Sequence, residues 1–125
     1  MRKQYHFRPS DDGLRAWDVD RLIGLSRDHP DEEVPLAAIV EIDENYWFTN
    51  GYQPTVRSVV EHLRLIDEAD LSYAIVLDPD GRVMDGMHRV AKALCEGRAT
   101  VKGKRLATWP APDYVGVEPA ALPYE

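Results

Sequence analysis

The residues best suited to chemistry are consecutive, in the segment Asp85-Gly86-Met87-His88-Arg89. An apolar strand pattern ends at Asp-Gly, and an amphipathic helix pattern begins directly after it. The first turn of a helix has unpaired backbone N–H groups, and the helix dipole adds about half a positive charge there. Glycine has no side chain to keep a ligand away from the backbone. The sequence therefore predicts a site for a phosphate-like anion at this helix start.

Two side chains project from the predicted first turn, His88 and Arg89, while Met87 turns toward the core. Arginine can bind two oxygens of one anion, and histidine can donate, accept or carry a proton near neutral pH. Asp85 could cap the helix, orient its neighbours, or hold a metal that accompanies a nucleotide. Asp85 and His88 are therefore candidate catalytic residues. The candidate ligand-binding residues are Gly86, Met87, His88, Arg89 and Lys92.

Each of these residues also has a purely structural explanation. An aspartate before a helix is most often a cap, a glycine there can complete a turn, and a histidine on a first turn is commonly a surface residue. The Asp78-Pro79-Asp80-Gly81 segment is explained by its turn chemistry, so its two acids do not by themselves indicate a metal site. We predict no resident metal ion.

The charge distribution favours a small anion over a long polyanion. The 125-residue chain has a formal net charge of −7. Seven basic and two acidic residues between Arg82 and Arg105 give that segment about +5, which leaves about −12 for the remainder. Because affinity for nucleic acid comes mainly from lysine and arginine, DNA binding by this chain is disfavoured. The alternative for Lys102 and Lys104 is a solvated strand edge that resists aggregation.

The elements that must position this motif follow from periodicity and cap residues. Asp18 and Thr55 are expected N-caps, the second for an amphipathic helix with Val56, Val59, Val60, Leu63 and Ile66 on one face. The expected elements are a helix at 19–26, a strand or strand-turn at 34–42, a strand at 72–77, a hairpin return at 82–84, a helix from Met87 stopped by Gly97, and a strand at 100–106. Cys95 is placed on the apolar stripe of the last helix. This order predicts one α+β domain over residues 1–125, with an N-terminal helix and a proline-rich C-terminal tail as additions.

Nothing near the start of the chain has the pattern of a signal peptide, and no apolar run has the length of a membrane span. A single cysteine cannot form an internal disulfide. These observations favour a cytoplasmic setting with no membrane partner. They give no prediction of oligomeric state.

The segment from Ala74 through the turn to Asp85-Gly86-Met87-His88-Arg89, followed by an alanine-rich helix and Gly97, resembles the core of the ParB/sulfiredoxin superfamily. The earlier Val34-Pro35-Leu36 run and the helix from Thr55 fit the same arrangement, so the resemblance covers about residues 34–106. It implies a small mixed sheet flanked by helices and a nucleotide-phosphate site at the motif. The cofactor it implies is ATP or CTP with Mg²⁺, and the partner a nucleotide or small phosphorylated ligand.

Departures from the family narrow this expectation. Met87 stands where sulfiredoxins carry their nucleophilic cysteine, which argues against sulfinic-acid repair, and no DNA-reading domain of the partition-protein type follows the core. Kinase-like members of the superfamily resemble this chain in carrying an acid at the position of Glu41. Glu41 is therefore a candidate general base, and the alternative is that it is a strand residue facing solvent. The aromatic run Tyr46-Trp47-Phe48 could stack on a base or anchor its loop, and His62 is expected to be solvated. Two hypotheses follow: a nucleotide-dependent phosphotransferase or hydrolase, and a non-enzymatic regulatory or partner-binding module.

Overall fold

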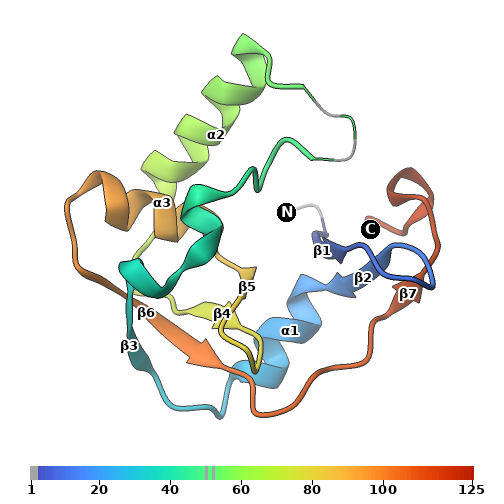
Figure 1. Cartoon of the computed structure of the whole chain (residues 1–125), viewed down its shortest axis with the longest axis horizontal. Helices are drawn as coiled ribbons and strands as arrows, with labels where there is room; N and C mark the ends of the chain where they lie inside the picture. The colour runs from blue at the N-terminus through green and yellow to red at the C-terminus, as the bar shows by residue number, and fades with distance from the viewer. Residues whose placement is uncertain (1–2, 50, 52) are drawn as a thin grey trace.

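The chain folds into two small β-sheets connected by helices (Figure 1). The structure is a computed structural model that describes residues 3–49, 51 and 53–125. A three-stranded sheet has the order β1 (Tyr5–Arg8), β2 (Arg15–Asp18), β7 (Tyr114–Val115). A four-stranded sheet has the order β3 (Glu32–Pro35), β6 (Thr100–Arg105), β4 (Ile75–Leu77), β5 (Val83–Asp85). The α-helices of the described residues are α1 (Val19–Ser26), α2 (Val56–Glu68) and α3 (Met87–Cys95), and the expected α+β class is confirmed.

The four-stranded sheet is mixed because of the route the chain takes through it. β4 and β5 form an antiparallel hairpin, α3 then crosses over, and β6 returns parallel to β4, while β3 pairs antiparallel with β6. The hairpin turn depends on Asp78, whose buried Oδ1 accepts hydrogen bonds from the N–H groups of Asp80 and Arg82 at 2.7 and 3.1 Å. The predicted turn is therefore confirmed, and it fixes where β5 ends and α3 begins.

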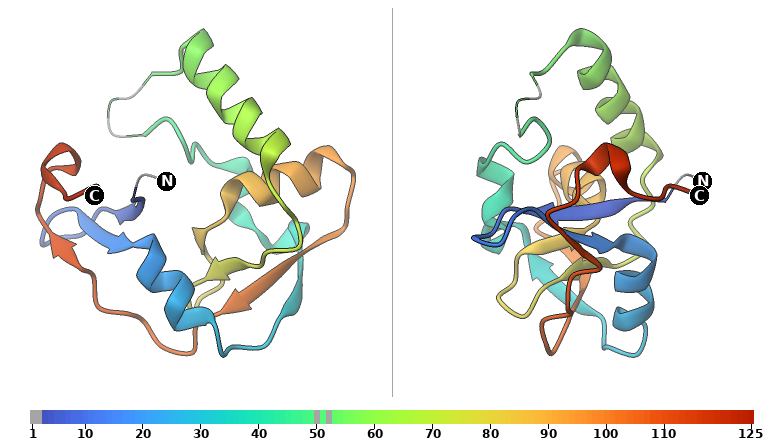
Figure 2. Two further views of the ribbon diagram at one scale, coloured as in Figure 1. Left: turned by 180° about the vertical axis from the view of Figure 1, so that it is seen from behind. Right: turned by 90° about the vertical axis from the view of Figure 1, so that its right-hand side faces the viewer.

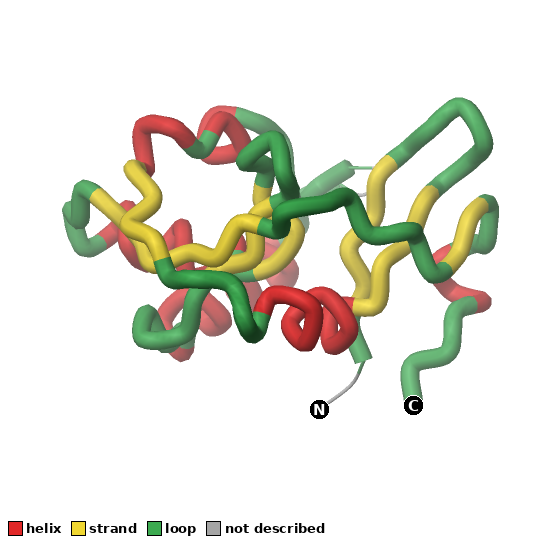
Figure 3. Tube along the Cα trace, turned by 90° about the horizontal axis from the view of Figure 1, so that it is seen from below, coloured by secondary structure: helices red, strands yellow, loops and turns green. Residues whose placement is uncertain are grey.

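Successive strand residues point to opposite faces of the sheet, and the core divides accordingly. Ile75, Leu77 and Val83 pack on one face with Val90 of α3. The intervening Val76 and Met84 pack on the other face, in a cluster with Trp17, Leu22 of α1 and Leu106. The sheet is thus covered by α3 on one side and α1 on the other. In Figure 3 the two sheets lie at opposite ends of the molecule with α1 between them.

The expected caps are present at two helices. Asp18 accepts a hydrogen bond from the N–H of Asp20 at the start of α1, and Thr55 and Ser58 form a reciprocal capping box at the start of α2. The amphipathic pattern of α2 predicts a covered apolar face, but none of the residues of this helix is buried. This helix projects away from the sheets (Figure 2), and its apolar side chains Val56 and Leu63 are 84% and 57% exposed.

The expectation for 34–42 is confirmed in its strand-turn form, whereas the expectation for Cys95 was wrong. The apolar run at 34–42 is a strand only as far as Pro35. Leu36 donates its N–H to Ala99, just before β6 begins, so no strand partner remains and the chain continues as 3-10 turns at Leu36–Ala38 and Val40–Asp43. Cys95 is an exposed free thiol and not a core residue, because the buried face of α3 is formed by Met87, Val90 and Ala93.

The N-terminal strands and the C-terminal tail share one sheet and are tied to the core. Trp17 donates its Nε1–H to the carbonyl of Pro110 at 2.9 Å, and the Arg8 guanidinium lies 2.7 Å from the buried Asp78 carboxylate. The guanidinium also lies 5.2 Å from the centre of the Trp109 ring. No helix among the described residues has the length and apolar character needed to cross a membrane.

Candidate functional site

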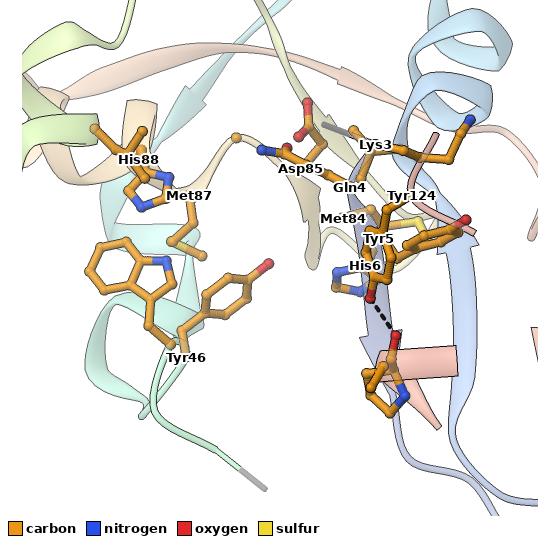
Figure 4. A pocket seen from close by; sticks show the side chains of 16 residues that line it. Lys3, Gln4, Tyr5, His6, Tyr46, Met84, Asp85, Met87, His88 and Tyr124 are labelled. Atoms are coloured by element: carbon orange, nitrogen blue, oxygen red, sulfur yellow. Dashed lines mark hydrogen bonds between the residues drawn. The ribbon is translucent and has the colours of Figure 1, made fainter. Parts of the chain in front are cut away.

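The predicted helix start opens onto a cavity that we call the large cavity. The cavity has a volume of about 630 Å³. One wall consists of Tyr46, Trp47 and the segment from Met84 to His88. The opposite wall consists of residues near the two chain ends, including Tyr5, His6, Pro119 and Tyr124 (Figure 4). The motif therefore lies in a space between the two sheets.

Gly86 is the N-cap of α3 and has a φ of 104°, a conformation that side-chain-bearing residues rarely adopt. A Cβ at this position would lie 2.7 Å from Cγ2 of Ile75. Glycine is thus required at this position by the packing against β4. The Gly86 carbonyl accepts the N–H groups of Arg89 and Val90, while the N–H groups of Met87 and His88 find no acceptor in the described part of the chain.

Asp85 and Arg89 form an ion pair with 3.0 Å between Nη2 and Oδ2. Burial raises the pKa of the Asp85 carboxyl, and the charge of Arg89 opposes that shift. Asp85 lines the large cavity, as expected for a residue at its mouth. Arg89 does not, since its guanidinium is held by Asp85 and near the carbonyl of Ala74, toward a second cavity of about 340 Å³.

Lys92 is also directed away from the large cavity. Its Nζ donates hydrogen bonds to the carbonyls of Asp67 and Ala69 at 2.8 and 2.7 Å, where α2 ends. The side chain therefore caps the C-terminus of α2, where a positive charge is favourable.

The basic segment 82–105 does not form an open positive surface, because most of its cations already have acidic neighbours. Besides the Arg89 pair, the ion pairs are Arg82–Glu44, Arg98–Glu96, Lys102–Asp31, Lys104–Asp31 and Arg105–Glu32. Lys102 and Lys104 lie on β6, which is an inner strand, so the alternative of a sheet-edge role was wrong. Attraction for an anion must come mainly from the start of α3.

Glu41 is buried at 3% exposure, so the alternative of a solvent-facing strand residue was wrong. It lies in a 3-10 turn, and its Oε2 accepts the N–H of Val83 at 2.5 Å, which ties this turn to β5. Its Oε1 has no hydrogen-bond partner among the described residues. Glu41 does not line the large cavity, and the structure does not bring it together with Asp85 and His88 there.

His62 and Trp47 complete the site around His88, and sequence reasoning had placed His62 in solvent. His62 Nδ1 lies 2.8 Å from His88 Nε2, so the two imidazoles form a hydrogen-bonded pair. The indole of Trp47 stacks on both rings, at centroid distances of 4.4 Å to His62 and 4.9 Å to His88. The rings of Phe48 and His62 pack in a T-shaped arrangement. We call this group the Trp47–imidazole stack.

Burial dominates the protonation of the cavity walls. It lowers the pKa of His88 to about 4, with additional lowering by His62 and Arg89. It also lowers the pKa of His62, against the opposing influence of Glu61. The pKa of Tyr46 is raised to about 12, first by burial and then by Glu41 and Asp85. At neutral pH both imidazoles are neutral and the Tyr46 hydroxyl, which points into the cavity in Figure 4, is a hydrogen-bond donor.

Comparison with known proteins identifies no relative of this chain: no family model, no curated protein and no solved structure matches it. Among the described residues no group of three or more acidic, histidine or cysteine side chains could hold a metal ion. The arrangement supports binding of a small ligand by backbone N–H groups, aromatic faces and imidazole. It offers one carboxylate, Asp85, to a cation that a ligand brings with it.

Proposed function

We propose that the large cavity binds a phosphate-bearing small molecule, with a nucleotide as the leading candidate. The observation that carries this proposal is the pair of unpartnered N–H groups at the start of α3, which belong to two residues, Met87 and His88, that line a cavity with aromatic walls. Such N–H groups and the helix dipole together favour a phosphate. The cavity volume lies within the range of small-molecule sites.

The walls also suit the remainder of a nucleotide. A base can stack on an aromatic side chain whatever its identity, and Tyr46 and Trp47 border the cavity beside the helix start. ATP or CTP with Mg²⁺ are the ligands to test first, with Asp85 as the residue that would meet the accompanying Mg²⁺. A cytoplasmic location, where nucleotides are abundant, is part of the proposal.

We keep the relationship to the ParB/sulfiredoxin superfamily as part of this proposal. Its support is the β4–β5 hairpin, the helix that begins directly after Gly86, and the strand β6 that follows Gly97 and pairs parallel with β4. These features follow one another in the order that the resemblance implies.

The second candidate is a module that binds its ligand without turning it over. It is favoured by the positions of one expected catalytic residue, Glu41, and one expected ligand-binding residue, Arg89. Glu41 bonds to Val83 outside the cavity, and Arg89 is held by Asp85 on the far side of the helix start. Phosphoryl transfer or hydrolysis would therefore depend on His88, Asp85 and the helix start alone.

Calorimetry with ATP, CTP and GTP, with and without Mg²⁺, tests the proposal, and amide NMR spectra of the same titrations locate the ligand. We expect the largest shifts at the N–H groups of Met87 and His88. Binding that shifts residues of the second cavity, such as Ala74 and Lys104, would place the ligand elsewhere, and no binding of any nucleotide would refute the proposal. Product formation over hours separates an enzyme from a binding module.

A further inference from the structure

The Trp47–imidazole stack is built from three segments far apart in the sequence. Trp47 belongs to the loop after the 3-10 turn at Val40–Asp43, His62 to α2 and His88 to α3. The planes of Trp47 and His88 differ by 12° and those of Trp47 and His62 by 21°, so one indole face covers both imidazoles. His88 and Trp47 border the large cavity. Because His88 borders the cavity, a ligand bound there can change the protonation of the histidine pair.

We propose that the His62–His88 pair takes up one proton from solvent when the cavity binds a multiply charged oxyanion, such as the terminal phosphate of a nucleotide. This inference rests on the proposed ligand site and names how the site balances the ligand's charge. The hydrogen between His62 Nδ1 and His88 Nε2 stays between the rings. The incoming proton occupies the ring nitrogen that the pair leaves free, Nδ1 of His88 or Nε2 of His62.

The fold itself keeps this pair neutral for identifiable reasons. Both rings are partly removed from water, which disfavours the charged form. His88 lies in the first turn of α3, where the helix dipole repels a positive charge, and Arg89 adds to that repulsion. Glu61 on α2 acts in the opposite direction on His62. Trp47 and Phe48, which pack on the pair from the loop, carry no charge.

A bound dianion would favour the protonated form of the His62–His88 pair. Its negative charges at the N–H groups of Met87 and His88 would offset the helix dipole and favour an imidazolium beside them. A neutral partner imidazole can accept a hydrogen bond from the protonated ring, so the pair holds one proton without losing its contact. The face of Trp47 adds a favourable cation–π interaction.

The other positively charged side chains near the cavity are already paired with carboxylates. Lys3 lines it, but its Nζ lies 2.7 Å from the Asp18 carboxylate. Arg89 is paired with Asp85. Of the titratable groups in the described lining, His6 accepts a hydrogen bond from Arg8, and burial lowers its pKa to about 3. His88, which lines the cavity, and its partner His62 are therefore the groups at the described lining best able to take up a positive charge when a ligand binds.

Calorimetry in two buffers of different ionisation enthalpy measures the protons taken up on binding. Sulfate is the first probe because it stays a dianion between about pH 5 and 8, so any proton belongs to the protein, and the tightest-binding nucleotide is the second. Near pH 6 we expect an uptake approaching one proton. By linkage, affinity should then weaken by about tenfold between pH 5.5 and pH 8.

Variants assign that proton. His62→Gln keeps a hydrogen-bonding partner for His88 and should reduce the uptake, while His62→Gln combined with His88→Gln should abolish it. His29→Gln is the matched control, because His29 Nε2 accepts the N–H of Ala107 away from the cavity, and it should behave like the wild type. Oxyanion binding without proton uptake, or uptake that persists in the double variant, would refute this inference and leave the ligand site standing. Failure of sulfate and of every nucleotide to bind would refute both.

Discussion

Replacing Gly86 with alanine tests the tightest constraint at the start of α3. At a φ of 104°, an alanine meets the general cost of a left-handed backbone, about 1–2 kcal/mol. Its Cβ would also lie 2.7 Å from Ile75 Cγ2, and Ile75 is completely buried in β4. Overpacking of this kind costs about 1–3 kcal/mol, so we expect Gly86→Ala to lower the free energy of unfolding by about 2–5 kcal/mol.

Gly97→Ala is the matched control. Gly97 has a φ of 70°, so it shares the backbone cost, but a Cβ there would have no atom within 4 Å. Its free energy of unfolding should fall by only about 1–2 kcal/mol. Urea denaturation followed by circular dichroism measures both variants. If Gly86→Ala is no more destabilising than Gly97→Ala, contact with Ile75 is not the reason for glycine at this position.

The remaining predictions concern side chains around the site. Asp78→Ala removes the acceptor of two turn N–H groups and the partner of Arg8, so it should cost about 3–5 kcal/mol by urea denaturation, whereas Asp80→Ala at the exposed turn position should stay within about 0.5 kcal/mol. Lys92→Met removes the cap from the end of α2 and should cost about 0.5–1.5 kcal/mol; an equally large loss of nucleotide affinity, measured by calorimetry, would show that Lys92 contacts the ligand after all. Burial and the charge of Arg8 lower the pKa of His6 to about 3 from 6.5. The folded state then binds fewer protons than the unfolded chain in that interval, so stability should fall as the pH decreases from about 6.5 toward 3. Unfolding curves of His6→Gln should lack this component, and an identical pH dependence in that variant would rule out His6 as its source.

Local chemistry explains what could be predicted from the sequence. Asp18 and Thr55 start their helices through hydrogen bonds to residues two or three positions away, and the Asp78 turn closes within four residues. The motif from Asp85 to His88 is likewise a contiguous segment whose helix start can be recognised without the rest of the fold.

The remainder depends on contacts between distant residues. His62 and His88 are 26 positions apart and Arg8 and Asp78 are 70 apart, so no periodic pattern relates them. The direction of Arg89 is set by Asp85 and the carbonyl of Ala74, which compete with any ligand for the same donors. The burial of Glu41 follows from the end of the β3–β6 pairing, which the apolar pattern of 34–42 did not show.

The cavity has one practical consequence for anyone who prepares this protein. One of its walls is made by the first strand and the last residues of the chain. There the hydroxyl of Tyr5 donates a hydrogen bond to the carbonyl of Pro123, and the N–H of Lys3 donates one to the carbonyl of Tyr124. A fragment trimmed to residues 34–106 would keep the whole Asp85–Arg89 motif and lose half of the chamber around it. Affinity tags attached near either of these segments would sit beside the same wall, so binding measurements belong on the untagged chain with residues 1–125 intact.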